Sequence, residues 1–302
     1  MRKHSDNYYE KAYTSETETR TTDRSRIGKA LNFASREAYK HLRTNLDFSL
    51  ADVSGCRCVG LTSPMRGDGK SLTSINLGYS LAEDGYKVIL VEGDLRIPSL
   101  GKKLGFKQEK GLSNILSEDG PITSVKPSCI YQDREGYFDI MTAGDIPPNP
   151  QELLGSARMV EFVEFLKKIY DYVILDLPPV TVVADALVAS KVLDGMLLII
   201  RHNHSEKGAL SEAVRSMEFA GIRICGFVFN AADNDDTGYT KRYKYRYRYY
   251  RTGYRKDYGY YQNSYYTSDR NSVNVKTNDS ENHSHRKEEE SDRHTHTLDT
   301  GN

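Results

Sequence analysis

Between residues 27 and 230 the chain alternates short apolar runs with amphipathic segments, and this alternation restricts the folds that it can adopt. Short apolar runs are typical of buried strands, whereas apolar positions spaced three and four apart are typical of helices. Strands that alternate with helices favour a mostly parallel sheet with helices on both faces and right-handed connections. We therefore predict one α/β domain of roughly 200 residues, which is long enough for one sizeable core.

The expected elements follow from this pattern. Continuous apolar runs predict strands at residues 58–62, 88–92, 138–142, 172–176, 196–200 and 225–230. Amphipathic stretches predict helices at residues 34–50, 71–83, 112–116, 157–169, 182–192 and 207–220. No apolar run approaches the length of about 18 residues that marks a membrane-spanning helix, so we expect no spanning segment.

A glycine-rich turn, Gly67-Asp68-Gly69-Lys70-Ser71, separates the first predicted strand from the helix predicted at 71–83. Small residues let backbone N–H groups surround phosphates, and the start of the next helix adds a favourable dipole. In such a loop the lysine reaches the β- and γ-phosphates and the serine hydroxyl ligates Mg²⁺. The strict pattern has a further glycine where Pro64 stands. The nucleotide-binding residues predicted here are Gly67, Asp68, Gly69, Lys70, Ser71 and Leu72.

Two other predicted strands end in acidic residues. Glu92 and Asp94 stand at the end of one strand, and Asp176 ends another. Ligands of open α/β sheets bind outside the carboxyl ends of the strands, so we expect these acids to meet the glycine-rich turn. Mg²⁺ prefers oxygen ligands, usually carboxylates together with phosphates and water. We therefore predict a metal site from Ser71, Asp94 and Asp176, with Arg96 as a further nucleotide-binding residue.

A tyrosine-rich segment follows the last predicted strand. Twelve of the 22 tyrosines lie between Tyr239 and Tyr266, in a segment without Leu, Ile, Val, Phe or Met. It has almost nothing to bury, and eight basic residues against one acid give residues 239–261 a charge of about +7. Such a segment is a poor structural element but a good substrate for phosphoryl transfer. The candidate acceptors are Tyr243, Tyr245, Tyr247, Tyr249, Tyr250, Tyr254, Tyr258, Tyr260, Tyr261, Tyr265 and Tyr266.

Composition divides the chain into four parts. We predict a disordered segment at 1–26, the phosphate-binding domain at 27–232, the tyrosine-rich basic tail at 233–266 and a disordered polar extension at 267–302. The chain begins without an apolar signal region, and its cysteines lie mainly in apolar surroundings. We therefore expect reduced thiols, a cytosolic location and no zinc site. The cysteines are Cys56, Cys58, Cys129 and Cys225.

Together, the glycine-rich turn and the two acidic motifs resemble the Walker A, A′ and B motifs of the bacterial tyrosine kinases of capsule and exopolysaccharide synthesis. These P-loop enzymes are unrelated to eukaryotic protein kinases. The segment SREAYKHLRTNL is similar to the family's E-x-x-R-x-x-R helix, which packs subunits into a ring. Glu37 and Arg43 match this motif, while Lys40 replaces an arginine. Residues 143–154 and the tyrosine cluster also match family segments.

This resemblance implies an ATP-dependent protein-tyrosine autokinase that uses ATP and Mg²⁺ and regulates polysaccharide synthesis. Lys70 and Ser71 would bind phosphate and Mg²⁺, and Asp94 and Asp176 would hold the metal and its waters. Glu92 stands where the family usually has aspartate, the favoured general base for the tyrosine hydroxyl. The extra methylene moves the carboxylate by roughly 1–1.5 Å, and misplacement on that scale can cost about 10²-fold in rate.

The resemblance also implies partners. A separate membrane-spanning protein would activate the kinase through its cytoplasmic tail, which would keep the chain at the inner face of the plasma membrane. Glu37, Lys40 and Arg43 would form the ring contact, with phosphorylation between neighbouring subunits. A phosphotyrosine phosphatase would reverse the modification.

Two other classes of protein share part of this pattern. Partitioning and septum-placing ATPases of the Min/Par type have the same sheet and acidic motifs, but they carry a signature lysine where Met65 stands. Basic residues interleaved with aromatic ones can also stack on bases and follow phosphates, as in nucleic-acid binding. We do not expect nucleic acid to be the main partner, and salt-dependent retention of DNA by the tail would test this.

Overall fold

The computed structural model describes residues 26–106, 110–124, 126–132 and 136–232. These residues form a seven-stranded sheet with the order β3-β4-β2-β5-β1-β6-β7. All neighbouring strands are parallel except β3 and β4, which pair antiparallel at one edge. The predicted α/β class with a mostly parallel sheet is therefore confirmed. The strands are β1 Arg57–Thr62, β2 Lys87–Glu92, β3 Ser128–Gln132, β4 Tyr137–Met141, β5 Tyr172–Asp176, β6 Gly195–Arg201 and β7 Ile224–Asn230.

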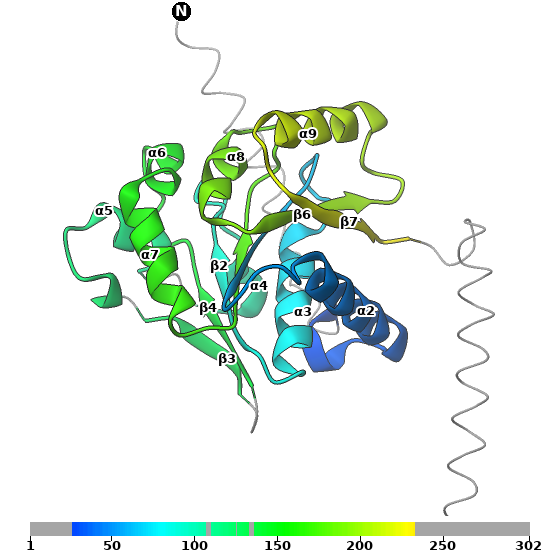
Figure 1. The fold of residues 1–302 in the computed structure, drawn as a ribbon, viewed down its shortest axis with the longest axis horizontal. Helices are drawn as coiled ribbons and strands as arrows, with labels where there is room; N and C mark the ends of the chain where they lie inside the picture. Colours follow the sequence, from blue (N-terminus) through cyan, green and yellow to red (C-terminus); the bar gives the residue numbers. More distant parts are fainter. Residues whose placement is uncertain (1–25, 107–109, 125, 133–135, 233–302) are drawn as a thin grey trace, which may run out of the picture. The chain divides into compact units, whose positions relative to one another are not determined.

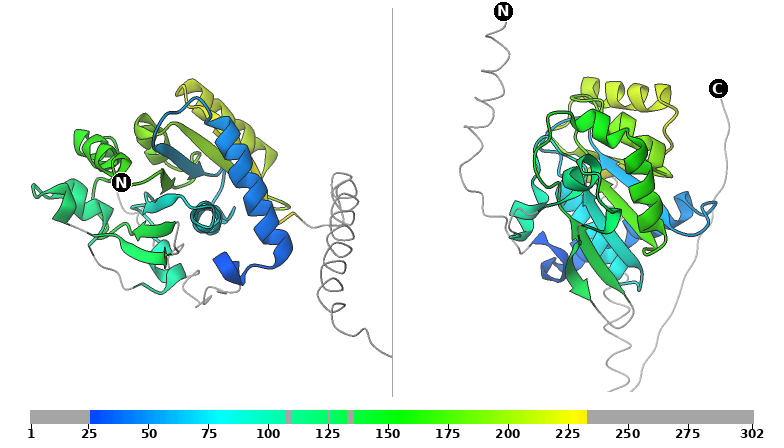
Figure 2. Two further views of the ribbon diagram at one scale, coloured as in Figure 1. Left: turned by 60° about the horizontal axis from the view of Figure 1, so that its bottom comes forward. Right: turned by 90° about the vertical axis from the view of Figure 1, so that its left-hand side faces the viewer.

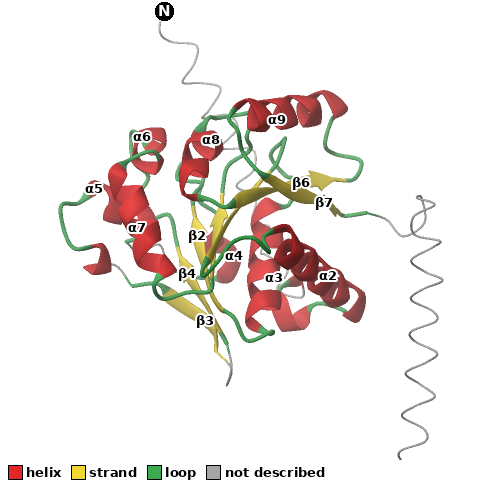
Figure 3. Cartoon of the chain, in the orientation of Figure 1, coloured by secondary structure: helices red, strands yellow, loops and turns green. Residues whose placement is uncertain are grey.

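Helices cover both faces of this sheet (Figures 1, 2 and 3). One face carries α2 and α3, and the other carries α7, α8 and α9, as the two apolar clusters of the core show. The α-helices are α2 Phe33–Ser49, α3 Lys70–Ala82, α4 Leu100–Leu104, α5 Leu112–Ser117, α6 Pro150–Leu154, α7 Ala157–Lys167, α8 Asp185–Ala189 and α9 Lys207–Phe219. Short 3₁₀ helices occupy Gly28–Ala30, Ile122–Ser124 and Ser190–Val192.

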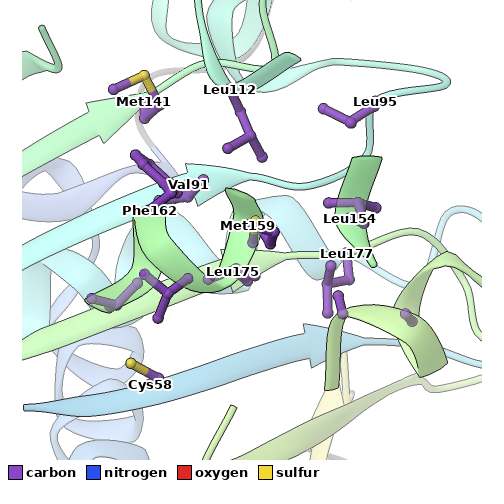
Figure 4. Packing of buried hydrophobic residues seen from close by; sticks show 14 of the residues in the cluster. Cys58, Val91, Leu95, Leu112, Met141, Leu154, Met159, Phe162, Leu175 and Leu177 are labelled. Carbon is purple, nitrogen blue, oxygen red and sulfur yellow. The ribbon is translucent and has the colours of Figure 1, made fainter. Parts of the chain in front are cut away.

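Strand β2 shows why the central runs are continuously apolar. Val88 and Leu90 pack into the cluster beneath α2 and α3, while Ile89 and Val91 pack into the opposite one. Because successive side chains of a strand point to opposite faces, a strand covered on both sides needs apolar residues throughout. Figure 4 shows the cluster on the face of α7, α8 and α9, to which Val91 of β2 and Phe162 of α7 both belong.

Four elements differ from the expected ones. No strand was predicted at β3, a short edge strand whose pairing with β4 is irregular. Helices α4 and α6 were also not predicted, because five residues are too few to show a helical period. The helix expected at 182–192 is shorter, with α8 followed by a 3₁₀ turn.

The remaining expectations concern the cysteines, membrane-spanning helices and the terminal segments. Cys56, Cys58 and Cys225 are free thiols, as expected. Within the ranges described above, no helix is both long and apolar enough to cross a membrane. Residues 1–25 of the predicted N-terminal segment, the polar extension, the tyrosine-rich tail and all its candidate acceptors lie outside the described residues.

Candidate functional site

The glycine-rich turn joins β1 to α3 in the conformation that phosphate binding requires. Gly67 and Gly69 have φ values of 83° and 95°, in the left-handed region that favours glycine. A Cβ atom on Gly69 would lie 2.0 Å from Nδ2 of Asn230, so a side chain here would displace Asn230 as well as strain the backbone. The first backbone hydrogen bond of α3 runs from Thr73 N to Gly69 O at 2.9 Å. The amide groups of residues 70–72 precede that bond and form a helix start able to bind an anion.

The side chains of Leu72 and Asp68 are engaged within the protein, so these two residues can contact a nucleotide only through their backbones. The Leu72 side chain packs against the apolar cluster beneath α3, which leaves its backbone for a phosphate. The Asp68 side chain is buried and accepts hydrogen bonds from Met65 N at 2.9 Å and Ser205 Oγ at 2.7 Å. Asp68 therefore shapes the loop, and only its backbone can face a nucleotide in this conformation.

Residues far along the chain hold the outside of the loop. Arg201 Nη1 donates to Gly67 O at 3.0 Å, and Asn230 Nδ2 donates to Asp68 O at 2.8 Å. Thr181 Oγ1 donates to the carbonyl of Pro64 at 2.5 Å. The sequence analysis missed these residues, although Arg201 and Asn230 are themselves polar residues that end strands. Together these contacts fix the loop, and they do so with proline in place of the usual glycine.

The acidic strand ends lie side by side next to this loop. Glu92 and Asp176 are register partners on β2 and β5, and only 1% and 2% of their surfaces are exposed. Ser74 Oγ of α3 donates to Asp176 Oδ1 at 3.3 Å. Burial raises the pKa of Asp176, and the Lys70 ammonium and the Ser71 hydroxyl oppose this rise. The predicted meeting of Lys70, Ser71 and Asp176 is thus present in the structure.

Asp94 is the most accessible of the three carboxylates Glu92, Asp94 and Asp176. Its side chain is half-buried, and Oδ1 accepts a hydrogen bond from Ile97 N at 3.1 Å. Burial raises its pKa, while the Ile97 amide and the positive charges of Lys70 and Arg66 oppose the rise. Asp94 therefore lies within electrostatic range of the phosphate-loop lysine and remains open to a ligand.

Glu92 is held differently, because backbone groups occupy both of its oxygens. Oε1 accepts from the amides of Ser99 and Leu100, the latter at 2.6 Å, and Oε2 accepts from Ala143 N at 3.1 Å. Burial raises its pKa in spite of these three bonds. A general base must lie within hydrogen-bond reach of the proton that it abstracts. These contacts make Glu92 a brace that connects β2 to the start of α4 and to Ala143. Its predicted role as general base stays a prediction.

Comparisons with known proteins agree with this geometry. The profile of a family described as an AAA domain matches residues 61–211. Tyrosine-protein kinase YwqD of Bacillus subtilis (strain 168) is 34% identical over 194 residues, which cover 64% of this chain and 80% of YwqD. The chain belongs to the bacterial tyrosine kinase family. A solved member of that family, the kinase domain of the Escherichia coli tyrosine kinase ETK, has a TM-score of 0.58 at 30% identity. This match covers 66% of this chain and 77% of the ETK domain.

The bacterial tyrosine kinases differ in how much of their length this chain spans. EpsB of Ralstonia nicotianae is 36% identical over 220 residues, which cover 72% of this chain but only 28% of EpsB. The shared part therefore corresponds to a fraction of that relative, in contrast to most of YwqD.

Arg96, the last residue of the motif similar to the tyrosine kinases' Walker A′, forms a paired contact with α8. Its Nε and Nη2 atoms donate to the Asp185 carboxylate at 2.8 and 3.0 Å, and the Asp185 side chain is fully buried. This fork ties the segment after β2 to α8. The predicted contact between Arg96 and nucleotide stays a prediction.

The residues that match the tyrosine kinases' ring helix all lie on α2. Lys40 Nζ pairs with Glu37 Oε1 at 2.7 Å, one helical turn away. Arg43 pairs with Asp84 at 3.0 Å and donates to Ser80 O at 2.7 Å, so it joins α2 to the end of α3. All three side chains therefore have partners within one chain, and their part in assembly stays a prediction.

The donor set fits the ligands that a tyrosine kinase of this type would need. Ser71, Asp94 and Asp176 offer hard oxygen atoms, which suit Mg²⁺. In the part of the chain that the structure describes, no group of three or more His, Cys, Asp and Glu side chains is arranged to hold a metal alone.

Proposed function

We propose that this chain is an ATP-dependent protein-tyrosine kinase whose acceptors include its own tyrosine-rich tail. The observation that supports this most is the convergence of Lys70, Ser71, Asp94 and Asp176 beside a preformed phosphate loop. Membership of the bacterial tyrosine kinase family and the similarity to the tyrosine kinases YwqD and ETK support the same reaction. Phosphoryl transfer depends mainly on positioning and charge neutralisation, which such a site can supply.

Each residue has a role in this proposal. The amides of residues 70–72 and the Lys70 ammonium bind the phosphates, and Ser71, Asp94 and Asp176 hold Mg²⁺ or its waters. Mg²⁺ bound there would neutralise charge on the phosphates. Asp94 accepts the proton of the incoming tyrosine hydroxyl, because it is more accessible than Glu92, whose carboxylate is 1% exposed.

Phosphorylation would change the charge of the tyrosine-rich tail. Residues 239–261 carry a charge of about +7, and each phosphotyrosine adds about −1.5 to −2. About four phosphates would cancel this charge, and further ones would reverse it. We propose that Glu37, Lys40 and Arg43 support a ring in which one subunit phosphorylates the next. Phosphorylation then weakens the assembly, and an unchanged oligomer size after it would argue against this.

The wider setting is also a proposal. A membrane-spanning activator would hold the chain at the inner face of the plasma membrane and link it to capsular or exopolysaccharide synthesis. A phosphotyrosine phosphatase would reset the tail. The resemblance of the sequence motifs to the tyrosine kinases of capsule and exopolysaccharide synthesis supports this setting, and a relative named tyrosine-protein kinase CpsD, from Streptococcus agalactiae, is 30% identical over 204 residues.

The test is phosphotyrosine formation by the purified full chain with Mg-ATP. We expect tyrosine phosphate on the wild-type protein and none on Lys70→Met, because Lys70 supplies the charge that the phosphates need. Phosphotyrosine on Lys70→Met would mean that another enzyme forms it. ATP hydrolysis without phosphotyrosine would instead favour an ATPase of the Min/Par type.

A further inference from the structure

Lys103 of α4 lies at the candidate site although nothing in the sequence connects it with phosphate binding. Two contacts fix the start of α4 at the carboxyl end of β2. The Leu100 side chain packs into the apolar cluster beneath α3, and Glu92 accepts hydrogen bonds from the amides of Ser99 and Leu100. The helix is therefore held where its last turn can reach the phosphate loop.

The Ser99 hydroxyl connects the Lys103 ammonium to Ser71. Nζ donates to Ser99 Oγ at 2.5 Å, and Ser99 Oγ lies 3.4 Å from Ser71 Oγ. The ammonium is therefore two hydrogen-bond lengths from a proposed Mg²⁺ ligand. The electrostatic neighbours of Lys103 are Asp176, Glu92, Asp94 and Lys70, which are the charged residues of the site itself.

The partners of this ammonium are incomplete. A lysine ammonium carries three N–H donors. Among the described residues its hydrogen bond goes to one neutral hydroxyl, and it forms no salt bridge. Burial lowers the pKa of Lys103, so the charge is partly withdrawn from water, while the nearby carboxylates oppose this effect.

We propose that Lys103 binds the terminal phosphate of the nucleotide as a second cation beside Lys70. Phosphate oxygens would accept the two remaining N–H groups. The phosphate loop surrounds the inner phosphates with its own amides. Lys103 instead comes from the segment after β2 that also carries Asp94, on the side of the site where the proposed base lies. This inference rests on the proposed function, and it assigns Glu92 the indirect task of positioning α4.

Nucleotide affinity tests this proposal without relying on catalysis. The dissociation constants of the full chain for Mg-ADP and for a non-hydrolysable Mg-ATP analogue are measured by calorimetry. We expect Lys103→Met to weaken binding of the analogue by about 10- to 100-fold, the usual range for a hydrogen bond to a charged group, and binding of ADP by less than about threefold. Lys102→Met is the matched control, because Lys102 is the exposed neighbour on the same helix, and it should bind both nucleotides like the wild type.

Each outcome decides the question. Equal losses for ADP and the analogue, or no loss for either, would overturn the assignment to the terminal phosphate. Lys103→Gln keeps a donor for Ser99 and provides a second variant if Lys103→Met does not fold, with the same selective loss expected. If Lys103→Gln also unfolds, Lys103 is structural and the proposal fails. Wild-type protein that binds neither nucleotide would refute the proposed function itself.

Discussion

Replacing Glu92 with aspartate distinguishes its two possible roles. Aspartate is the residue that the resemblance to the bacterial tyrosine kinases leads one to expect at this position. If Glu92 is the general base and is misplaced by its extra methylene, Glu92→Asp should raise the rate by up to about 10²-fold. If Glu92 is a brace, the shorter side chain should break the contacts that hold α4 and should bring no gain in rate.

The loss of stability expected if Glu92 is a brace can be estimated from the three hydrogen bonds that its carboxylate accepts. Their lengths include 2.6 Å to Leu100 N and 3.1 Å to Ala143 N. Withdrawing the carboxylate by about 1.5 Å would take at least two of these bonds beyond the usual limit of about 3.2 Å. A hydrogen bond to a charged group contributes about 1.5–3 kcal/mol, so the loss is about 3–6 kcal/mol. Domains of this kind have a free energy of unfolding of about 5–15 kcal/mol, so the change is large.

The pH dependence gives an independent check. Burial already raises the pKa of Glu92 in the folded state. A raised folded-state pKa means that the group favours folding when it is protonated, below its ordinary value, and that this contribution is lost as pH rises through the folded-state pKa. Aspartate with fewer hydrogen bonds should have its pKa raised further. The difference in stability between wild type and Glu92→Asp should therefore be largest at neutral pH and should shrink in acid.

The assay combines urea denaturation of the nucleotide-free protein with the rate of phosphotyrosine formation. Glu118→Asp is the control, because Glu118 is an exposed glutamate with a surface partner, Lys110. That control should change the free energy of unfolding by less than about 1 kcal/mol. If Glu92→Asp is as stable as the wild type and forms phosphotyrosine faster, Glu92 is not a brace, and its role as the general base is supported.

Two further substitutions test other parts of the site. Asp176→Asn should abolish phosphotyrosine formation yet raise the melting temperature of the nucleotide-free protein at neutral pH, because burial raises the pKa of Asp176 and the ionised form opposes folding. A lower melting temperature at neutral pH would contradict this. Arg96→Met should lower the free energy of unfolding by about 3–5 kcal/mol, since it leaves the fully buried Asp185 unpaired, and Arg96→Met with Asp185→Asn should recover much of the loss. Equal instability of the single and double variants in urea would count against this pairing.

The sequence predicted the parts of the site that follow from strand ends. A polar residue that ends a buried apolar strand can be recognised in the chain, and the rule for parallel sheets places Asp94 and Asp176 beside the glycine-rich turn. The same rule would have marked Arg201 and Asn230, which end β6 and β7 and hold the loop from outside. The fold class followed for the same reason, since continuous apolar runs are a consequence of burial on both faces.

The roles of Glu92 and Lys103 could not be predicted in this way, because they depend on where a five-residue helix sits. The Glu92 carboxylate receives N–H groups from residues seven, eight and 51 positions further along the chain. No local pattern carries that information, and a helix as short as α4 has no measurable period. Lys103 looks like an ordinary surface lysine beside Lys102 until the structure brings it to Ser99.

The charges of the candidate site give the roles of Glu92 and Lys103 a common cause. Burial raises the pKa of Glu92, Asp94 and Asp176 together, so all three carboxylates are held in a region that disfavours their ionised forms. Lys70 and Lys103 are the lysines whose charges act on Asp176. Two ammonium groups do not balance three carboxylates, and a divalent cation would more than supply the difference. Phosphates brought in with that cation would in turn need the N–H groups of both lysines. The ionised site is therefore more stable when loaded than when empty, and Mg-nucleotide should stabilise the wild-type fold more than the Asp176→Asn fold.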